Sequence, residues 1–379
     1  MVGREKMAEK VIHVDVCIVG AGPSGALLGY LLAKNGVSTL VIERNAGKTP
    51  EFRGEHVSGE TEKILKEHNL FTKVEEKGLL RMKRVEYIDH GNVVKVVTPQ
   101  TNEEHVGIHV PQAHLISTII EESAKFDSYH LMLNTKGTGL IQNDAGAYCG
   151  VRAKKGEEEW RVNSSIVVGA DGRYSTVRKL ANIPSQIIKH GYDVLWAKIP
   201  APTGWEPTVR MLLSDNQQLA LFTQTGGFVQ IGWNIKKGKF PQLKKEPIDP
   251  FLRPLFENFP ELKDIVLQNL QSWKDFVLLD VFSSKSPTWV KDGLVMIGDA
   301  AHTMTPTGAV GINTGMKDAY VLAPILTNAI KAKKYSKDIL SEFELVRREI
   351  VELIQEEQIN KEESFVSNFM YYSQLDVTR

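Results

Sequence analysis

The feature that most constrains the fold is a glycine-rich turn between an apolar strand and a helix near the N-terminus. Residues 14–19 predict a short buried strand, and residues 26–35 predict the helix. The turn from Gly20 to Gly25 matches the pattern G-x-G-x-x-G. In such a turn the first glycine permits a tight bend, the second lets the backbone meet a pyrophosphate, and the third lets the helix pack on the strand. A chance match of glycines is the alternative, and the segment after the helix distinguishes between the two interpretations.

The chain continues as a dinucleotide-binding unit would. Gly36 ends the predicted helix, residues 37–42 predict a second strand, and Glu43 follows that strand directly. An acidic residue about 20 positions beyond the glycines can accept hydrogen bonds from ribose hydroxyls. The helix N-terminus stabilises phosphate charge. These residues together predict a site for a dinucleotide.

A second motif lies in the middle of the chain. Residues 166–168 predict a strand, which leads into an Asp-Gly turn containing Asp171 and Gly172. Arg173 and Arg178 follow closely, and a guanidinium group suits contacts with phosphate. The turn alone is compatible with any loop, so its position after a buried strand is what favours a cofactor role.

A third motif lies near the C-terminal end. Residues 293–297 predict a strand that ends in Gly298-Asp299, and residues 306–315 form a glycine-rich turn before a predicted helix at 316–330. A carboxylate at the C-terminal edge of a strand lies where open sheets bind ligands. Glycines let backbone N–H groups approach a flat or anionic ligand. An ordinary tight connection between strand and helix is the alternative.

In this order the three motifs resemble those of the class A flavoprotein monooxygenases of the para-hydroxybenzoate hydroxylase type. The resemblance covers nearly the whole chain, and the Gly-Asp segment with Pro306, Gly308, Gly311 and Asn313 is its most specific part. It implies an α/β, Rossmann-like FAD/NAD(P)-binding fold with an inserted antiparallel β-sheet substrate domain. It also implies noncovalently bound FAD and a reductant, NADPH or NADH.

The same resemblance implies roles for single residues. Glu43 would bind the adenosine ribose, Asp299 the ribityl chain, and the backbone around residues 311–314 the pyrimidine edge of the flavin. Arg53 lies where the family places an arginine near the pyrophosphate, whereas Gln112 replaces an arginine that contacts FAD in many members; a glutamine donor can serve instead. The expected cofactor-binding residues are Gly20, Gly22, Pro23, Ser24, Gly25, Glu43, Arg44, Arg53, Gln112, Asp171, Arg178, Gly298, Asp299, Gly308, Gly311, Ile312 and Asn313.

The segment between the second and third motifs differs in sequence pattern from the regions around the motifs. Short apolar runs separated by turn residues favour an antiparallel sheet. We expect four strands, at residues 194–199, 208–213, 218–223 and 228–233. We also expect a hairpin at residues 85–97, with its turn at Gly91-Asn92, and a helix at 255–273. The expected FAD-binding domain is discontinuous and comprises residues 1–80, 106–182 and 286–379. The expected substrate domain comprises residues 81–105 and 183–285.

The C-terminal region is predicted to be helical. Phe343, Val346, Ile350 and Ile354 recur at helical spacing and form one apolar stripe. The stripe fits either a dimer surface or packing on the cofactor domain. We favour packing, because an amphipathic helix needs only one face covered. The expected oligomeric state is a monomer or a homodimer.

Composition excludes several classes of function. The 379 residues carry 46 basic and 46 acidic side chains, so charge gives no case for nucleic acid or an anionic membrane. No apolar run approaches a membrane span, residues 1–10 lack the apolar region of a signal peptide, and no cluster has metal-ligand spacing. Cys17 and Cys149 form no disulfide framework, which suits a reducing, cytoplasmic location.

The resemblance implies hydroxylation of an electron-rich aromatic or heteroaromatic small molecule with NAD(P)H and O₂, through a C4a-hydroperoxide of the flavin. Pro306 would border the place where oxygen reacts. Arg210, Gln224, Gln230 and Trp233 alternate on the predicted sheet and are candidates for substrate contact, although each also fits a sheet-surface or packing residue.

Other interpretations stay open. A flavin-dependent reductase or dehydrogenase acting on a hydrophobic substrate shares these motifs, and so does a flavin-binding protein without activity. A halogenase is a weaker alternative, because residues 231–235 match its tryptophan-rich signature only faintly. His56 fits a proton relay or an incidental loop residue, and we interpret His302 as a structural part of its turn.

Overall fold

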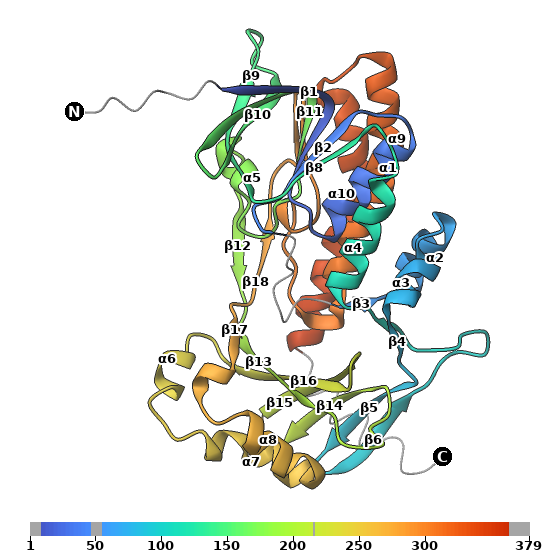
Figure 1. Ribbon diagram of the computed structural model, residues 1–379. Helices are drawn as coiled ribbons and strands as arrows, with labels where there is room; N and C mark the ends of the chain where they lie inside the picture. The colour runs from blue at the N-terminus through green and yellow to red at the C-terminus, as the bar shows by residue number, and fades with distance from the viewer. Residues whose placement is uncertain (1–8, 47–54, 215–216, 364–379) are drawn as a thin grey trace.

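The computed structural model describes residues 9–46, 55–214 and 217–363, and it has two sheet-based units joined by a narrow ribbon (Figure 1). An eight-stranded sheet forms the upper unit of the view and a seven-stranded sheet the lower unit. The ribbon consists of β12 (Gln186–Lys189) and β18 (Phe282–Lys285), which pair antiparallel. Two separate hydrophobic cores correspond to the two units.

The larger sheet brings the three motifs to one edge. Its strands follow the order β19-β20-β11-β1-β2-β8, and the pairs from β20 to β8 are parallel. In the register, Val19 lies beside both Ile42 and Gly169, and Gly169 lies beside Met296. Parallel strands that end level place their following loops side by side. The strands are β1 (Lys10–Val19), β2 (Thr39–Ile42), β8 (Tyr129–Met132), β11 (Glu158–Gly169), β19 (Val290–Lys291) and β20 (Leu294–Met296).

Helices cover one face of this sheet and a β-meander lies against the other side (Figure 1). The meander strands β9 (Thr135–Gln142) and β10 (Tyr148–Lys155) continue antiparallel from β11. Residues 25–33 of the first helix are all buried, because the sheet, α4 and α9 surround that helix. The covering helices are α1 (Pro23–Lys34), α4 (Gln112–Ser123), α9 (Gly311–Ala332) and α10 (Lys337–Glu363).

The smaller sheet has the order β17-β13-β16-β15-β14-β5-β6. Its pairs are antiparallel except β14 with β5, so the expectation of a wholly antiparallel sheet is wrong at that pair. Strand β5 comes from an earlier segment of the chain and enters in the same direction as β14. The predicted hairpin is present, with Gly91 in its turn at φ +78°. The strands are β5 (Arg84–Asp89), β6 (Asn92–Val97), β13 (Tyr192–Pro200), β14 (Thr208–Ser214), β15 (Gln217–Gln224), β16 (Phe228–Lys236) and β17 (Val277–Leu279).

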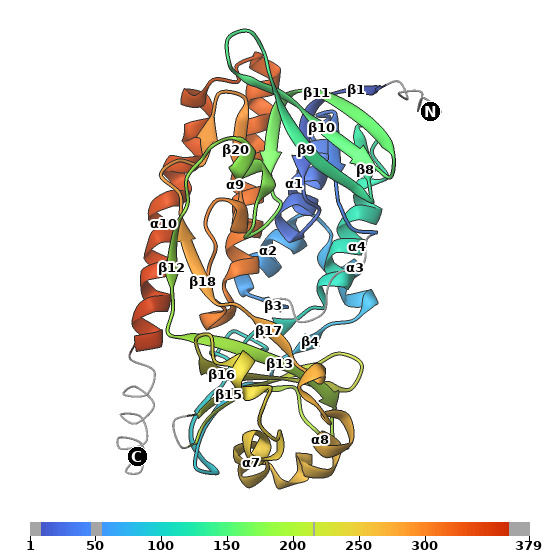
Figure 2. The same cartoon turned by 90° about the vertical axis from the view of Figure 1, so that its left-hand side faces the viewer.

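Short helices pack against one face of the smaller sheet, on the side away from the larger unit (Figures 1 and 2). The main ones are α7 (Asp249–Asn258) and α8 (Lys263–Asn269), with α6 (Phe240–Leu243) beside them. The single helix predicted at 255–273 is therefore wrong. The chain breaks at Phe259, before Pro260, which lacks the N–H that a continuing helix needs.

The C-terminal helix α10 divides the predicted apolar stripe between two environments. Phe343 is fully buried and belongs to the core of the larger unit, as expected for packing on that unit. Val346 and Ile350 are 54% and 46% exposed, so they do not contribute to this seam. The buried seam instead includes Arg347, which pairs with a buried carboxylate of α9.

Small elements fill the junction between the two units. A three-stranded sheet has β7 (Ile108–His109) between β3 (His56–Val57) and β4 (Leu80–Arg81). Helices α2 (Gly59–Glu67) and α3 (Phe71–Lys77) lie between β3 and β4 in the chain, and α5 (Thr176–Leu180) follows β11. The division into a cofactor domain and a substrate domain, with the boundaries expected above, stays a prediction.

Candidate active site

The fingerprint turn between β1 and α1 is shaped by glycines whose places no other residue fits. Gly20 has φ +107°, and a Cβ there would collide with the backbone of Ala170. A Cβ at Gly25 would collide with the carbonyl oxygen of Gly20. At Gly22, by contrast, no described heavy atom lies within 4 Å of the Cβ position. The turn is therefore closed on the side of the sheet and open at Gly22, where Pro23 begins the helix.

Glu43 lies next to this turn. One oxygen of its carboxylate accepts a hydrogen bond from the Ala21 N–H at 2.9 Å, and the other accepts from the Asn45 N–H at 2.9 Å. The acidic residue predicted at the end of the second strand is thus in contact with the fingerprint loop. Arg44 is exposed. Arg53 lies outside the described residues.

The Asp-Gly motif joins two loops. The Asp171 carboxylate accepts hydrogen bonds from the Ser175 hydroxyl at 2.5 Å and from the Thr176 N–H at 2.6 Å, at the start of α5. Arg178 is 7% exposed and donates to the carbonyl oxygens of Ala300 and Arg173, at 2.8 and 3.1 Å. Both side chains hold the motif in place from within the protein.

The Gly-Asp motif meets the fingerprint helix through very small residues. Gly298 has φ +58°, and a Cβ on it would lie 3.0 Å from the Ser24 hydroxyl. A Cβ on Gly315 of α9 would collide with the same hydroxyl. Asp299 follows in the turn with 32% of its side chain exposed, and one of its oxygens lies 3.8 Å from Arg173 Nε. The Gly-Asp motif therefore meets the fingerprint helix at Ser24, and the Asp-Gly motif meets the fingerprint turn at Gly20, beside Ala170.

A buried charge cluster supports this convergence. One oxygen of Asp318, on α9, accepts the Gly298 N–H at 2.9 Å and lies 2.7 Å from His302 Nε2. The other oxygen accepts from Arg347 Nε of α10 at 2.8 Å. Burial alone would raise the pKa of Asp318, but His302 and Arg347 outweigh burial and hold it below its ordinary value. The contact gives His302 the structural position that we expected.

The first turn of α9 is linked to the small junction sheet. Asn313 accepts a hydrogen bond from the Ser58 N–H at 2.8 Å and donates to the His56 carbonyl at 3.0 Å. Gly308 has φ +73°, and no described heavy atom lies within 4 Å of a Cβ placed on Gly311. Pro306, in the loop before α9, and Ile312, in the first turn of the helix, are partly exposed. The segment thus has an open side at Gly311, which is bordered by backbone atoms.

A polar cluster closes the other side of the junction. Glu55 accepts a hydrogen bond from Gln224 Nε2 at 3.1 Å, and Gln224 also donates to Gln230. The Gln112 backbone N–H donates to Glu55, and His109 Nε2 lies 3.6 Å from its carboxylate. Burial raises the pKa of Glu55, although the Gln112 N–H opposes the shift. Burial lowers the pKa of His109 to about 3, so this ring is neutral at ordinary pH.

Sequence reasoning did not identify Glu55 as a site residue. Its signal was weak: one carboxylate before His56, in a loop with no periodic pattern. Its contact appears only when the segment before β3 meets the end of β15 in the folded protein, because Gln224 is 169 positions away in the chain. For His56, burial and the nearby His105 lower the pKa, and its carbonyl binds Asn313.

Two predicted substrate residues lie on the wrong face of the sheet. Trp233 is three positions after Gln230 in β16, so the two side chains point to opposite faces. Trp233 is 1% exposed and packs edge-on against Phe276, with ring centroids 5.3 Å apart. The expectation that these residues share a flavin-facing surface is therefore wrong for Trp233.

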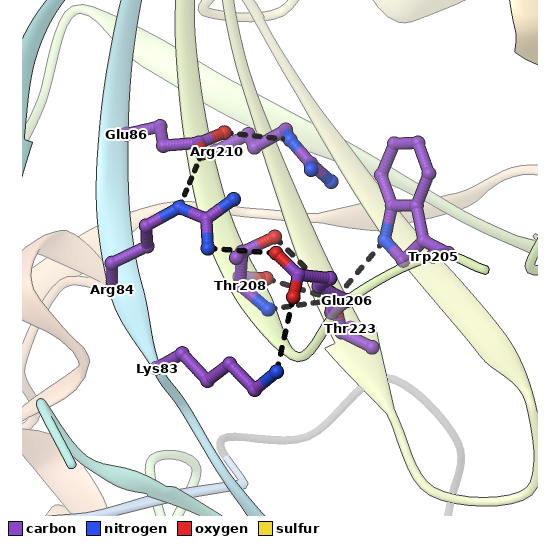
Figure 3. A network of polar contacts seen from close by, with 8 residues as sticks. All are labelled: Lys83, Arg84, Glu86, Trp205, Glu206, Thr208, Arg210 and Thr223. Carbon is purple, nitrogen blue, oxygen red and sulfur yellow. Dashed lines mark hydrogen bonds and ion pairs between the residues drawn. The ribbon is translucent and has the colours of Figure 1, made fainter.

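Arg210 is likewise turned away from Gln224 and Gln230. It shares a face of β14 with Leu212, which belongs to the core under the short helices. Figure 3 shows its contact network: Arg210 Nε donates to Glu86 at 2.8 Å, and its guanidinium lies 3.9 Å from the centre of the Trp205 ring. Lys83 and Arg84 complete the network, and both pair with Glu206. Its Nε is committed to Glu86 and its plane to Trp205, whereas its Nη1 is buried without a hydrogen-bond partner among the described residues.

The described residues fit FAD. The open backbone at Gly22 at a helix N-terminus suits a pyrophosphate, the carboxylate of Glu43 beside it suits ribose hydroxyls, and the open face at Gly311 suits a flat ring. Among the described residues, no group of three His, Cys, Asp or Glu side chains is arranged to hold a metal ion. No helix in the described part of the chain has both the length and the apolar character of a membrane span.

Comparisons with known proteins agree with this geometry. The family model of the FAD binding domain matches residues 13–357. The 6-methylpretetramide 4-monooxygenase of Streptomyces rimosus is 31% identical over 355 residues, which cover 92% of this chain and 83% of that protein. A digeranylgeranylglycerophospholipid reductase of Methanococcus vannielii is 25% identical over 343 residues, with 87% and 81% covered.

Among solved structures, PqsL of Pseudomonas aeruginosa, described as a probable FAD-dependent monooxygenase, shares the fold. Its TM-score is 0.80 at 19% identity, over 93% of this chain and 96% of that chain. The family match covers most of the sequence and contains all three motifs. The chain therefore belongs to the FAD-binding-domain family, and it is an FAD-dependent monooxygenase with the para-hydroxybenzoate hydroxylase type of fold.

Proposed function

We propose that this monooxygenase hydroxylates an electron-rich aromatic or heteroaromatic small molecule, with NADPH or NADH as the reductant. The observation that carries the proposal is the position of Glu55. Its partly buried carboxylate binds Gln224 of the smaller sheet. The next residue, His56, is bound through its carbonyl by Asn313 of the loop expected at the flavin. A proton acceptor thus lies between the two units.

The proposed cofactor roles follow the open surfaces of the site. Gly22 and Ser24 would bind the pyrophosphate through their backbone N–H groups, and Pro23, which has no N–H, would border it. Glu43 would bind the adenosine ribose. Asp299 would bind the ribityl chain. The loop from Gly308 to Asn313 would face the flavin ring, with Pro306 at its edge. FAD held by these residues would supply the redox chemistry that links the nicotinamide reductant to oxygen.

The proposed substrate roles belong to the polar cluster. Glu55 would accept the proton of an aromatic hydroxyl group, which increases the electron density of the ring and favours electrophilic oxygen transfer. Gln224 and Gln230 are 5% and 6% exposed, and their amides would orient the same hydroxyl. The raised pKa of Glu55 suits a group that takes up a proton near the operating pH.

The experiment is a substrate screen with the purified, FAD-loaded chain. Aromatic hydroxy compounds are added to the protein with NADPH or NADH in air, and nicotinamide consumption is followed together with product mass. The compound in the name of the S. rimosus relative, 6-methylpretetramide, is the first to test. The proposal predicts that one compound accelerates nicotinamide consumption and gains 16 mass units, the mass of one oxygen atom.

Other outcomes decide against the proposal. Saturation or oxidation of the compound without added oxygen would select a reductase or dehydrogenase. FAD binding without any turnover across the panel would select a flavin-binding protein. We also propose a cytoplasmic location, because Cys17 and Cys149 are both free thiols, as in a reducing compartment.

A further inference from the structure

The C-terminal helix ends in a carboxylate that gathers four hydrogen bonds. One oxygen of Glu362 accepts from the hydroxyls of Thr305 and Thr307, at 2.7 and 2.6 Å, and from the Tyr192 hydroxyl at 2.9 Å. The other oxygen accepts from His190 Nδ1 at 2.6 Å. Only 13% of the Glu362 side chain is exposed. This number of donors is unusual for a residue in the last turn of a long helix.

The four donors come from two segments with different tasks. Thr305 and Thr307 flank Pro306, in the loop that we place at the edge of the flavin. His190 and Tyr192 lie where the chain passes from the ribbon strand β12 into β13 of the smaller sheet. The Tyr192 hydroxyl also lies 2.9 Å from the Thr307 hydroxyl, so the two segments touch each other at the carboxylate.

The returning strand of the ribbon joins the same network. His190 Nε2 lies 2.9 Å from the Ser283 hydroxyl of β18. Both strands of the ribbon are therefore linked to Glu362, one directly through the His190–Tyr192 segment that follows β12 and one through His190. Figure 2 shows β12 and β18 running beside α10 from the upper to the lower unit.

Neighbouring turns of α10 bind the same loop through neutral side chains. Gln358 Nε2 donates to the carbonyls of Thr305 and Thr307, at 2.9 and 2.6 Å. Gln355 Nε2 donates to the carbonyls of Thr303 and Ser284, at 3.0 and 3.1 Å. Side chains from successive turns of α10 thus bind backbone carbonyls along the loop. Among the described contacts of this loop with α10, Glu362 supplies the charged one.

We propose that Glu362 is a positioning residue, which fixes the Thr305–Thr307 segment relative to the connection into the substrate sheet. The proposal rests on the proposed function only for the statement that this segment borders the flavin. A carboxylate is an acceptor at both oxygens and can serve four donors, whereas an amide has one acceptor oxygen and two N–H donors. Charge-assisted hydrogen bonds are also the stronger kind.

Ionisation of the group agrees with this geometry. Burial alone would raise the pKa of Glu362, but hydrogen bonds from His190, Thr307 and Thr305 outweigh burial and hold it below its ordinary value. The carboxylate is therefore charged at neutral pH. The same surroundings, burial first, raise the pKa of Tyr192, whose hydroxyl keeps its proton and remains a donor.

The test compares Glu362→Gln with Glu357→Gln in the full chain. Glu357 lies on the same helix, but 68% of its side chain is exposed and its partner is Lys361, at 3.7 Å. Hydrogen–deuterium exchange is measured for peptides covering residues 303–309, without FAD and with it. The visible spectrum of the bound flavin and the yield of product per nicotinamide consumed are measured on the loaded proteins.

We expect Glu362→Gln to speed exchange in this peptide about tenfold, because a charge-assisted contact is lost. It should also shift the flavin spectrum and lower the product yield, with anaerobic flavin reduction close to that of the parent. Glu357→Gln should change none of these. Tyr192→Phe, which removes one of the four donors, serves as the milder variant if Glu362→Gln does not fold. Combined with Glu362→Gln, it should add little.

Two results would overturn the proposal. One is exchange in residues 303–309 that is the same in Glu362→Gln and in the parent. The other is faster exchange spread equally over α10 and the smaller sheet, which would indicate general destabilisation. If the parent transfers no oxygen to any compound, the proposed function fails, but the exchange and spectral measurements still decide the role of Glu362.

Discussion

The end of the molecule where we place FAD, called the cofactor end, and the end where we place the substrate, called the substrate end, are built in different ways. At the cofactor end, backbone geometry forms the site. At glycines 20, 25, 298 and 315 an added Cβ would come too close to neighbouring atoms, and the parallel strands end at the same level of the sheet. At the substrate end, side chains from distant segments form the site, as in the contact between Glu55 and Gln224. The conformation of a backbone turn depends on residues that are close in sequence, whereas contacts between distant side chains depend on the whole topology.

This difference separates two kinds of mutational effect. Changes at the packed positions of the cofactor end should act on folding and FAD binding together, because the same loops, helices and buried charges stabilise both. Gly22 is the exception, because the position of its Cβ is open. Changes at the substrate end should act on substrate turnover and leave FAD binding intact. The predictions below test that separation, beginning with the largest expected effect.

The buried cluster under the Gly-Asp turn should give the largest loss of stability. Asp318→Asn removes the charge that pairs with Arg347, which is 3% exposed and has no access to bulk water. We expect the free energy of unfolding to fall by about 3–5 kcal/mol. Urea unfolding of the FAD-free protein measures this loss. Glu342→Gln, at an exposed position of α10, should change it by less than about 0.5 kcal/mol.

Glu55 should behave in the opposite way. Burial raises its pKa, so the folded protein binds this proton more tightly than the unfolded chain, and stability falls as the pH rises between the ordinary and the raised pKa. Glu55→Gln removes this loss. We therefore expect unchanged or higher stability at neutral pH, together with a fall in kcat/KM for the substrate of about 100-fold.

The pH dependence of the parent gives a second check on Glu55. Because the carboxylate must be ionised to accept a proton, kcat/KM should decrease on the acid side with an apparent pKa above that of an ordinary glutamate. Glu261→Gln, which changes an exposed residue of the smaller unit, should leave the profile as it is. A profile that is flat through this range would remove Glu55 from proton transfer.

Two glycines of the fingerprint turn should separate folding from binding. Gly25→Ala places a Cβ against the Gly20 carbonyl and should destabilise the FAD-free protein by about 1–3 kcal/mol. Gly22→Ala meets no described atom within 4 Å, so the FAD-free protein should fold normally while FAD affinity falls. Thermal unfolding and FAD titration measure the two effects. Equal FAD affinity in Gly22→Ala and the parent would place the pyrophosphate elsewhere.

Arg210 should give the smallest effect on catalysis. Its guanidinium pairs with Glu86 and stacks on Trp205, on the sheet face that the short helices cover. We expect Arg210→Lys to keep kcat/KM within about twofold, with a loss of stability of about 1 kcal/mol from the weaker stacking. A large increase in the KM of the substrate would show that this face does contact substrate.

The sequence predicted the fold around the cofactor end for a physical reason, whereas the roles of single residues toward FAD stay predictions. The fingerprint glycines, Glu43 and the Gly-Asp turn obey rules that relate neighbouring residues, and strand order then brings the motifs together. The start of α9 was misjudged by five residues, since Gly311 to Gly315 are helical and not a turn. Such errors concern boundaries and leave the location of the site unchanged.

The substrate end was predicted less well because face and register were uncertain. Gln230 and Trp233 cannot share a face at a spacing of three, and a single misplaced strand face reverses every assignment on it. Glu55 and Glu362 could not be found at all from local patterns. Their partners lie 169 and up to 172 positions away, so only the assembled structure shows the contacts.

The central claim is oxygen transfer, and labelled oxygen tests it most directly. The FAD-loaded chain, NADPH or NADH and a compound that accelerates nicotinamide consumption are incubated under ¹⁸O₂, and the product is examined by mass spectrometry. The account predicts that one labelled oxygen atom enters the aromatic product. A product altered without the label, whether reduced, desaturated or hydroxylated from water, would contradict it.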